Sequence, residues 1–494
     1  MTDHGLEHEL ATLDLGDVRL DRRARLVLRR CFASPQASPT AAQHNWAEMM
    51  GAYRLFDHED CTAQALLQAH ATAVLERVRE HTRVLVIQDT SELDYTHHPA
   101  LEGTGPLAAE ERQGFFLHTQ WVVSDQRLPL GTWQAQITAR EPSDGEANRR
   151  KRLPLEEKES YRWLEGYRAA CELAAQAPGV QVISMGDREN DIYEIYVEWQ
   201  QRRQANRPAA DWLIRCNQDR VLREDPSHPP AWPKPLRRGE GPLVPEVDAR
   251  LLAQLAQQPV VGGVRFTIQS KEQWKKVHGG NRQATFRQGR TVRQEIRVAQ
   301  VTPRPPHRPN TKLPAVTFWV VMATEIDPPP GQEPIHWVLL TSLPVTDLTQ
   351  ALRVLQLYLA RWEIEVFHRV LKSGCRIEKL QFAEASRLKP AIALYLIVAW
   401  RILFLMKLGR EVPELSCAVV FADFEWKPLW IIVRKQPLPP QPPSLGEVLR
   451  MIGQLGGHPG RRRDGPPGPQ ALWRGLQQVH AFAQAWQAFG PERS

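Results

Sequence analysis

The stretch that decides the fold of this chain reads Tyr358-Leu-Ala-Arg-Trp-Glu-Ile-Glu-Val-Phe-His-Arg-Val-Leu-Lys372. At about 100° per residue on a helix, four polar side chains fall within roughly 60° of one another; they are Tyr358, Arg361, Glu365 and Lys372. Apolar residues occupy the opposite side, so one face can pack into a core. Asp347 with Gln350 predicts a capping box at the start, and Gly374 predicts the end. On spacing alone, a solvated face with intrahelical Glu–Arg pairs is the simpler interpretation.

Two aspartates upstream follow strand-like sequences. Residues 84–87 form a short apolar run that leads to Asp89, and residues 180–186 form another that ends in Asp187. In open α/β sheets the ligand crevice lies at the carboxyl ends of strands, so both carboxylates are predicted to lie where chemistry is usually placed. A single aspartate after a strand is more often a turn former or a helix cap. The repetition weakens that interpretation, because two such carboxylates could meet at one site.

The segments around these aspartates alternate between strand and helix patterns. The predicted elements are a hairpin of strands 115–123 and 130–138, helices 156–176 and 190–202, and strands 212–215 and 336–341. This order predicts a mixed α/β sheet. Trp337 begins the last of these strands, and its default interpretation is a large core or interface residue.

The N-terminal region predicts a small helical unit. Residues 14–30 have an apolar face at helical spacing and a surrounding set of arginines, namely Arg19, Arg22, Arg23, Arg25, Arg29 and Arg30. A second helix is predicted at 46–56, with Arg54 on it, and a third at 64–80. Such a unit suits phosphate contact, and a solvated surface explains the composition equally well.

The region 218–334 differs in composition from its surroundings, because proline-rich segments at 226–230, 303–309 and 328–330 interrupt regular secondary structure. Strands are predicted at 264–269, 295–301 and 316–323, so the region resembles an inserted β-rich module. Its middle is basic, through Lys271, Lys275, Lys276, Arg282, Arg287 and Arg290. Either a DNA-facing surface or a mobile loop explains that charge.

The C-terminal region predicts helices. The apolar segment 391–408 is interrupted by Arg401 and Lys407, which favours a buried core helix over a membrane span. Helices at 445–455 and 471–489 are amphipathic, and their apolar faces could pair across a dimer or pack within one chain. Residues 461–463, three arginines in a Gly/Pro loop, are a further candidate DNA contact.

The composition restricts the class of protein but does not identify its function. The 494 residues carry 63 Lys plus Arg against 56 Asp plus Glu, a net charge of +7 and a pI near 9.1, compatible with a polyanionic partner. The six cysteines are scattered without metal-binding spacing, which suits a reducing cytosol. The acidic, polar beginning of the sequence is unlike a secretory signal, so we expect a cytoplasmic protein without a membrane anchor.

The motif Tyr-x-x-Arg-x-x-x-Glu-x-x-x-x-x-x-Lys at 358–372 resembles the YREK signature of bacterial insertion-sequence transposases of the DDE, cut-and-paste type. Residues 86–93 (Val-Ile-Gln-Asp-Thr-Ser-Glu-Leu) and 185–192 (Met-Gly-Asp-Arg-Glu-Asn-Asp-Ile) resemble the two aspartate segments of that family. Further resemblances lie at 157–160, before the second aspartate, at 15–19 and 51–54 in the end-recognition helices, and at 452–457 and 471–475 in the dimerisation region. Four separated motifs in the right order are far more specific than one.

The resemblance implies an α/β fold with an RNase H-like, mixed-sheet catalytic core that a β-rich insertion interrupts. All-α domains for DNA binding and dimerisation stand at the two ends. The implied boundaries are 1–65 for end binding, 66–217 and 335–375 for the core, 218–334 for the insertion and 376–494 for dimerisation.

For the chemistry, the resemblance implies a catalytic, metal-binding triad of Asp89, Asp187 and Glu365. Such a triad holds two Mg²⁺ ions, for which Mn²⁺ can substitute, and cuts phosphodiester bonds without a covalent enzyme intermediate. Without ions, three converging carboxylates repel one another, so the empty site is expected to be loose.

The resemblance also implies DNA contacts. Arg361 and Lys372 resemble the contacts to phosphates beside the cut, Tyr358 a contact to a backbone oxygen, and Trp337 a residue that stacks on a flipped base. Arg215 is a candidate for facing the active site, and the candidates for transposon-end contacts are Arg54, Arg19, Arg22, Arg23 and Arg25.

The predicted function is therefore a transposase that binds terminal inverted repeats as a homodimer, excises the element, with hairpin ends as the expected route, and joins it to target DNA. Two other classes stay open. One is a metal-dependent endonuclease of the same fold that never rejoins ends, and the other is a domesticated, non-catalytic repressor or inhibitor, against which the three intact acids argue. The inverted-repeat sequence, the target preference and the role of 218–334 are not encoded in these motifs.

Overall fold

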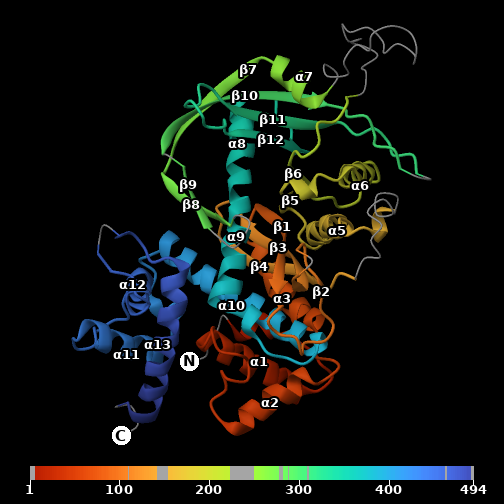
Figure 1. Ribbon diagram of the computed structural model, residues 1–494. Coiled ribbons are helices and arrows are strands. Elements are labelled where there is room, and N and C mark those ends of the chain that lie inside the picture. Colours follow the sequence, from red (N-terminus) through yellow and green to blue (C-terminus); the bar gives the residue numbers. More distant parts are fainter. Residues whose placement is uncertain are drawn as a thin grey trace, which may run out of the picture. The chain divides into compact units, whose positions relative to one another are not determined.

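The computed structural model describes residues 6–109, 111–141, 154–222, 250–276, 282–287, 289–308, 311–461 and 464–490. The chain folds into two compact units. The first comprises Met1–Asn148, Arg168–Val182 and Trp362–Ser494, and the second comprises Arg149–Tyr167 and Ile183–Arg361. Figure 1 labels their helices and strands.

The first unit begins with a short 3-10 helix, η1 (Glu7–Leu10), followed by α1 (Val18–Ala33), α2 (Trp46–Phe56) and α3 (Ala63–Arg79). Side chains cap all three α-helices: Asp17 accepts from the N–H of Arg19, Asn45 from that of Glu48, and Thr62 from that of Ala65. The three predicted N-terminal helices are confirmed.

The strands of the first unit are β1 (Arg83–Asp94), β2 (Gly105–Pro106), β3 (Gln113–Ser124) and β4 (Pro129–Thr138). β3 pairs antiparallel with β1, β2 and β4. The predicted hairpin is therefore confirmed.

One prediction in this sheet is wrong, because Asp89 does not end its strand. β1 continues to Asp94, and Asp89 lies opposite Thr119 in the middle of the ladder with β3. The apolar run stops at Ile87, but the backbone hydrogen bonds that define a strand need no apolar side chains. The polar half of β1 pairs with β3 as far as Asp94, which lies opposite Gly114.

α10 (Ala385–Glu411) is the central helix of the first unit. It is the one helix among the described residues that is long and apolar enough to cross a membrane, and 83% of its most apolar window is buried inside the protein. This burial confirms the predicted core helix. Its Trp400 donates from Nε1 to the carbonyl of Pro129, at the start of β4, over 3.1 Å.

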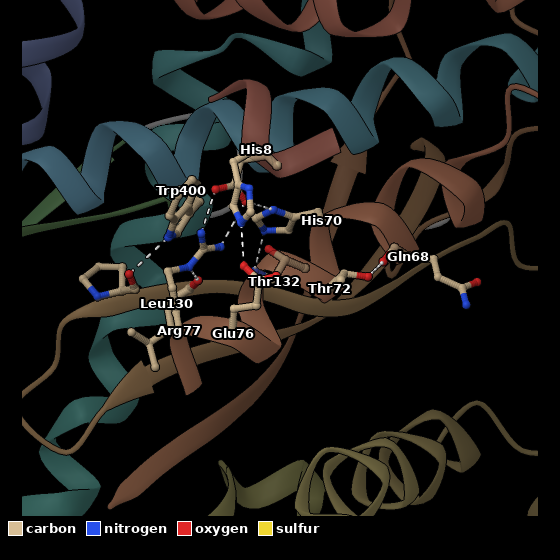
Figure 2. Close-up of polar contacts among 11 residues, drawn as sticks. His8, Gln68, His70, Thr72, Glu76, Arg77, Leu130, Thr132 and Trp400 are labelled. Carbon is tan, nitrogen blue, oxygen red and sulfur yellow. Dashed lines mark hydrogen bonds and ion pairs between the residues drawn. The ribbon is translucent and has the colours of Figure 1, made fainter. Parts of the chain in front are cut away.

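A buried polar network joins η1, α3, β4 and α10 inside this unit, as Figure 2 shows. Arg77 on α3 holds both carboxylate oxygens of Glu9 at 2.7 and 3.0 Å and also donates to the carbonyl of Leu130. Its guanidinium lies 4.2 Å from the centre of the Trp400 ring. The network therefore ties the N-terminal segment to both the sheet and the core helix.

His70 occupies the centre of this network in a defined tautomer. The backbone N–H of Thr132 donates to its Nε2, so Nδ1 carries the proton and donates to Glu9 over 2.6 Å. Burial lowers the pKa of His70 more than the Glu9 carboxylate raises it. Burial raises the pKa of Glu9, but His70 and Arg77 together outweigh it and lower that pKa overall. The stable state is thus neutral His70 beside an ionised Glu9–Arg77 pair.

Beyond α10, the first unit ends in α11 (Asp423–Arg434), α12 (Leu445–Leu455) and α13 (Pro469–Phe489). The two C-terminal helices predicted from the sequence are confirmed, and α11 was not predicted. All three helices pack against one another. Of the arginines at 461–463, the second and third lie outside the described residues.

The second unit contains a mixed sheet in the order β5-β6-β12-β11-β10-β7. Its strands are β5 (Gln181–Gly186), β6 (Asp211–Arg215), β7 (Val260–Ile268), β10 (Arg290–Val301), β11 (Phe318–Glu325) and β12 (His336–Thr341). β5 and β6 are parallel, and the remaining pairs in this order are antiparallel. All the strands predicted from residue 180 onward are confirmed, and α7 (Leu251–Gln257) is additional.

One prediction in this part of the chain needs correction. The helix predicted at 156–176 begins later, because a 3-10 turn, η2 (Leu155–Glu157), precedes α5 (Tyr161–Gln176). Of the two alternatives for the basic middle of the insertion, a loop does not describe its residues 271–276 and 282–287, since β8 (Lys271–Lys276) and β9 (Arg282–Arg287) pair antiparallel. Its role as a DNA-facing surface stays a prediction.

Candidate active site

The segment that contains Tyr358, Arg361, Glu365 and Lys372 is not one continuous α-helix. α8 (Leu348–Tyr358) is followed by a 3-10 turn, η5 (Leu359–Arg361), then by α9 (Trp362–Arg369) and a π-helical turn, η6 (Val370–Gly374). The continuous α-helix expected from the sequence is therefore wrong, because a 3-10 turn and a π turn interrupt it. Tyr358 and Arg361 belong to the second unit, and Glu365 and Lys372 belong to the first.

The predicted ends of this segment are confirmed with small changes. Asp347 accepts from the N–H of Gln350, but the Gln350 side chain accepts from Thr346, one residue before the position that a capping box requires. The π turn ends at Gly374, where an added Cβ would lie 2.9 Å from the Trp473 ring. Close packing explains this glycine.

In the second unit, Asp187 follows the last residue of β5, as predicted. Its carboxylate caps the short helix η3 (Arg188–Asn190) by accepting from the N–H of Glu189 over 2.8 Å. Burial, and then the adjacent Asp187, raise the pKa of Glu189. Two carboxyl groups, those of Asp187 and Glu189, therefore lie close together at the end of β5, where a nearby positive charge would be favourable.

Three arginines gather near this aspartate in the second unit. Burial lowers the pKa of Arg215, at the end of β6, and so do the neighbouring charges of Arg188 and Arg361, whereas Tyr358 and Asp187 raise it. The guanidinium groups of Arg188, Arg215 and Arg361 outnumber the carboxyl groups of Asp187 and Glu189, so positive charge is in excess among these five groups. Such a cluster favours an anionic ligand such as a phosphate.

Two polar atoms in this cluster are buried without a hydrogen-bond partner among the described residues. They are the Tyr358 hydroxyl and Nε of Arg215. Burial is the main cause that raises the pKa of Tyr358 to about 12, so its hydroxyl stays protonated and can donate. An unpartnered buried donor costs free energy in the unliganded protein, so both atoms are suited to meet an oxygen of a ligand.

Trp337 on β12 stands beside this cluster. Its ring packs edge-on against Tyr358, with the ring centres 5.7 Å apart. The tryptophan is partly exposed, and a partly exposed indole is suited to stack on a planar ligand. The sequence-predicted residues Asp187, Arg215, Trp337, Tyr358 and Arg361 therefore all lie in one unit and in one region of it.

The sequence analysis did not predict the hydrogen-bond network of the buried Asp191, close to this cluster in the chain. Asp191 accepts from the Tyr196 hydroxyl, from the backbone N–H groups of Asn217 and Gln218, and from Arg220, whose NH2 lies 2.6 Å away. These bonds fix the chain immediately after Arg215. The sequence feature that could have predicted this network is the second aspartate of the segment Asp187-Arg-Glu-Asn-Asp191.

In the first unit, Asp89 faces α9. Nδ1 of His368 on that helix lies 4.0 Å from the Asp89 carboxylate, and Nε2 contacts the Thr119 hydroxyl over 3.4 Å. Glu365 precedes His368 by three residues, so both side chains leave the helix on neighbouring sides. The first unit therefore brings the helix that carries Glu365 against the strand that carries Asp89. The sequence did not single out His368.

α9 is held on the sheet by aromatic packing. The ring of Phe367 stacks on that of Trp121 in β3, with centres 4.0 Å apart. Lys372, the last residue of the motif, donates to the carbonyl of Glu92 over 2.7 Å and lies 3.0 Å from the Glu378 carboxylate. The lysine is thus anchored at the polar end of β1, and its predicted phosphate contact requires exchange of these partners.

No group of three or more His, Cys, Asp or Glu side chains within the described ranges is gathered closely enough to hold a metal ion. Asp89 and Glu365 belong to the first unit and Asp187 to the second. The donor chemistry nevertheless suits Mg²⁺, which prefers carboxylate oxygens.

The predicted end-binding arginines differ in their surroundings. Arg22 and Arg54 are exposed, and Arg19 pairs with Asp17 at the start of α1. The guanidinium of Arg23 covers Gly51 of α2, and Arg25 donates to the carbonyls of Leu10 and Ala11. Arg23 and Arg25 therefore have structural contacts, whereas Arg22 and Arg54 present their charge to solvent.

Comparison with known families bears on both ends of the chain. Residues 3–61 match a family model described as transposase DNA-binding, and residues 397–489 match one described as the Tn5 transposase dimerisation domain. The first match covers α1 and α2, and the second covers the end of α10 and all of α11 to α13. These matches support a Tn5-type DNA transposase that binds DNA and forms a homodimer.

Proposed function

We propose that this protein is a DDE transposase of the insertion-sequence type, which excises its element by metal-dependent cut-and-paste cleavage and joins it to target DNA. The supporting observation is the cluster in the second unit, where Asp187 lies among Arg188, Arg215 and Arg361 beside two unpartnered buried donors. A carboxylate next to an anion-seeking cluster is what cleavage of a phosphodiester requires: a metal ligand beside groups that hold the phosphates.

Asp89, Asp187 and Glu365 are the residues that would hold two Mg²⁺ ions. When bound, the ions lower the pKa of a water or 3′-hydroxyl and stabilise the leaving oxygen.

The arginines and Tyr358 bind and orient the DNA. Arg361 and Arg215 hold the phosphates beside the cut, and the Tyr358 hydroxyl donates to a backbone oxygen. Trp337 stacks on a base turned out of the duplex, which suits release through hairpin ends. Lys372 leaves Glu378 to contact a further phosphate when DNA is bound.

The N-terminal helices bind the inverted repeats, and the C-terminal helices pair two chains in the synaptic complex. Arg22 and Arg54, exposed on α1 and α2, are the strongest candidates for contacts to the transposon ends. Arg19 reaches the same DNA after release from Asp17, whereas Arg23 and Arg25 fix the helices that carry the contacts.

The test is cleavage of DNA that bears the ends of the protein's own element, with Mg²⁺. Asp89→Asn, Asp187→Asn and Glu365→Gln are each expected to abolish cleavage while end binding, followed by gel shift, persists. The matched control is Glu363→Gln, which removes a carboxylate from the same helix but one that pairs with Lys407 at 3.0 Å. Undiminished cleavage by any of the three triad variants excludes that residue from the site.

The same assay distinguishes a transposase from an endonuclease of the same fold. The proposal predicts strand transfer of the cut ends into a target plasmid, with loss of transfer in the triad variants. Cleavage without any transfer product, under conditions where both ends are bound, contradicts the transposase and supports the endonuclease.

A further inference from the structure

Two histidines and one glutamine from distant parts of the chain meet on the first unit. His44 precedes α2, and His480 and Gln484 lie one turn apart on α13. Nε2 of His44 lies 3.1 Å from Nε2 of His480, and the terminal amide atom of Gln484 contacts Nε2 of both rings, at 3.0 Å from that of His480. The three atoms form a closed triangle.

Hydrogen bonds cannot satisfy all three sides of this triangle. An amide NH₂ only donates and an amide oxygen only accepts, while each imidazole Nε2 either carries a proton or offers a lone pair. If the amide nitrogen points inward, both rings must accept, and two lone pairs face each other. If the amide oxygen points inward, both rings must donate, and two N–H groups face each other. Whichever way the amide is turned, one of the three contacts joins two donors or two acceptors.

We propose that His44, His480 and Gln484 form a binding site for one zinc ion. With the proton of each ring on Nδ1 and the amide oxygen turned inward, an assignment that heavy-atom positions leave open, all three atoms offer lone pairs to a cation. Two imidazole nitrogens at about 2.0–2.1 Å from one tetrahedral zinc lie roughly 3.3 Å apart, close to the separation seen here. Water completes the coordination.

The ligand chemistry selects zinc or a similar transition metal over Mg²⁺, because imidazole nitrogen is a poor ligand for hard cations. Arg30, which lies near the site, is engaged by both oxygens of Glu48, at 3.0 and 2.8 Å, and this pairing offsets its positive charge.

The site connects two segments with separate tasks. His44 belongs to the segment that matches the DNA-binding model, and His480 and Gln484 belong to the segment that matches the dimerisation model. A zinc ion there fastens the start of α2 to α13 within one chain. The inference does not depend on the catalytic triad or on the proposed cleavage chemistry.

The test uses the full-length protein, freed of metal with a chelator and titrated with zinc chloride by calorimetry. We expect one site in the wild type that is lost, or weakened about 100-fold or more, in His44→Ala and in His480→Ala. Gln484→Ala is expected to weaken binding less. The matched control is His97→Ala, which removes an exposed histidine of the same unit outside the cluster.

A second measurement keeps the outcome unambiguous. Zinc is expected to raise the melting temperature of the wild type and of His97→Ala, but not that of His44→Ala, whose circular dichroism must match the wild type. Equal zinc stoichiometry and affinity in the wild type and the His44→Ala, His480→Ala double variant overturn the proposal and leave a cluster of hydrogen bonds only.

Discussion

At the scale of one residue, Tyr358 combines a destabilising feature, a buried hydroxyl, with a predicted DNA contact. Its hydroxyl is buried without a partner among the described residues, although it stands near Arg215 and Arg361. A buried hydroxyl left unsatisfied costs about 1–3 kcal/mol. A buried hydroxyl of this kind beside a basic cluster is suited to a ligand that supplies the missing acceptor.

Tyr358→Phe is therefore expected to leave the melting temperature unchanged or slightly higher, because no hydrogen bond within the described structure is lost. Cleavage of transposon ends is expected to fall about 10–100-fold, the range for a lost bond to a charged phosphate. Thermal unfolding and the cleavage assay measure the two effects separately.

Tyr196→Phe is the matched control, since that hydroxyl donates to Asp191 over 2.6 Å inside the core. It is expected to destabilise the protein by about 1–3 kcal/mol. A loss of stability in Tyr358→Phe as large as that in Tyr196→Phe contradicts the account of an unpartnered hydroxyl.

At the scale of single elements, the segment from α8 to η6 shows where sequence reasoning stops. The polar residues, the cap at Asp347 and the end at Gly374 could be predicted, because they depend on residue type and spacing. The 3-10 turn at 359–361 and the π turn at 370–374 could not, because residue type and spacing do not mark them. The packing contacts of this segment, such as Trp121 with Phe367 and Trp473 with Gly374, join residues that are far apart in the sequence.

The same limit applies to β1 and to the β8–β9 pair. The apolar run 84–87 predicts a strand, but its continuation to Asp94 depends on β3, which the local sequence does not reveal. The basic residues of β8 and β9 obscured a hairpin whose backbone pairing is regular. By contrast, Asp187 was placed correctly, because an apolar strand followed by a capping aspartate is a local pattern.

Gly374→Ala tests the close packing that accompanies the π turn. The added methyl group would lie 2.9 Å from the Trp473 ring, so we expect a destabilisation of about 1–3 kcal/mol. Gly468→Ser is the matched control, because no atom lies within 4 Å of its added Cβ and serine is a good cap for α13. Equal melting temperatures for the two variants contradict the packing account.

At the scale of the whole molecule, the Glu9–His70–Arg77 network predicts how stability depends on pH. The folded pKa of His70 lies below its usual 6.5 and that of Glu9 below its usual 4.5. The unfolded chain therefore binds more protons below about pH 6.5, so stability is fully present above that pH and falls as the pH decreases, by up to about 1.4 kcal/mol per unit for His70.

Melting temperatures measured between pH 5 and pH 7.5 test this dependence. His70→Gln removes the titrating ring and is expected to flatten the curve in that window, at the cost of lower stability at pH 7.5. The control His97→Gln, at an exposed site, is expected to keep the slope of the wild type. An unchanged slope in His70→Gln contradicts the role assigned to His70.

The C-terminal helices predict a surface for the homodimer. Ile431 and Ile432 on α11 are 38% and 42% exposed, inside the segment that matches the dimerisation model. Exposed isoleucines in such a segment favour burial against a second chain. Ile432→Glu is therefore expected to shift the DNA-bound protein from dimer to monomer in light scattering.

Val260→Glu supplies the comparison, because Val260 is 43% exposed on β7, outside the matched segments. It is expected to leave the mass of the complex unchanged. A dimer that persists in Ile432→Glu shows that α11 does not form the interface.

The central claim is that Asp89, Asp187 and Glu365 act together as metal ligands in DNA cleavage. Its most direct test is metal rescue of Asp187→Cys in the cleavage assay, since a thiolate binds Mg²⁺ poorly and softer divalent ions such as Mn²⁺ better. We predict no cleavage by this variant with Mg²⁺ and recovered cleavage with Mn²⁺, while the wild type cuts with both ions. Full cleavage by Asp187→Cys with Mg²⁺ would contradict the claim.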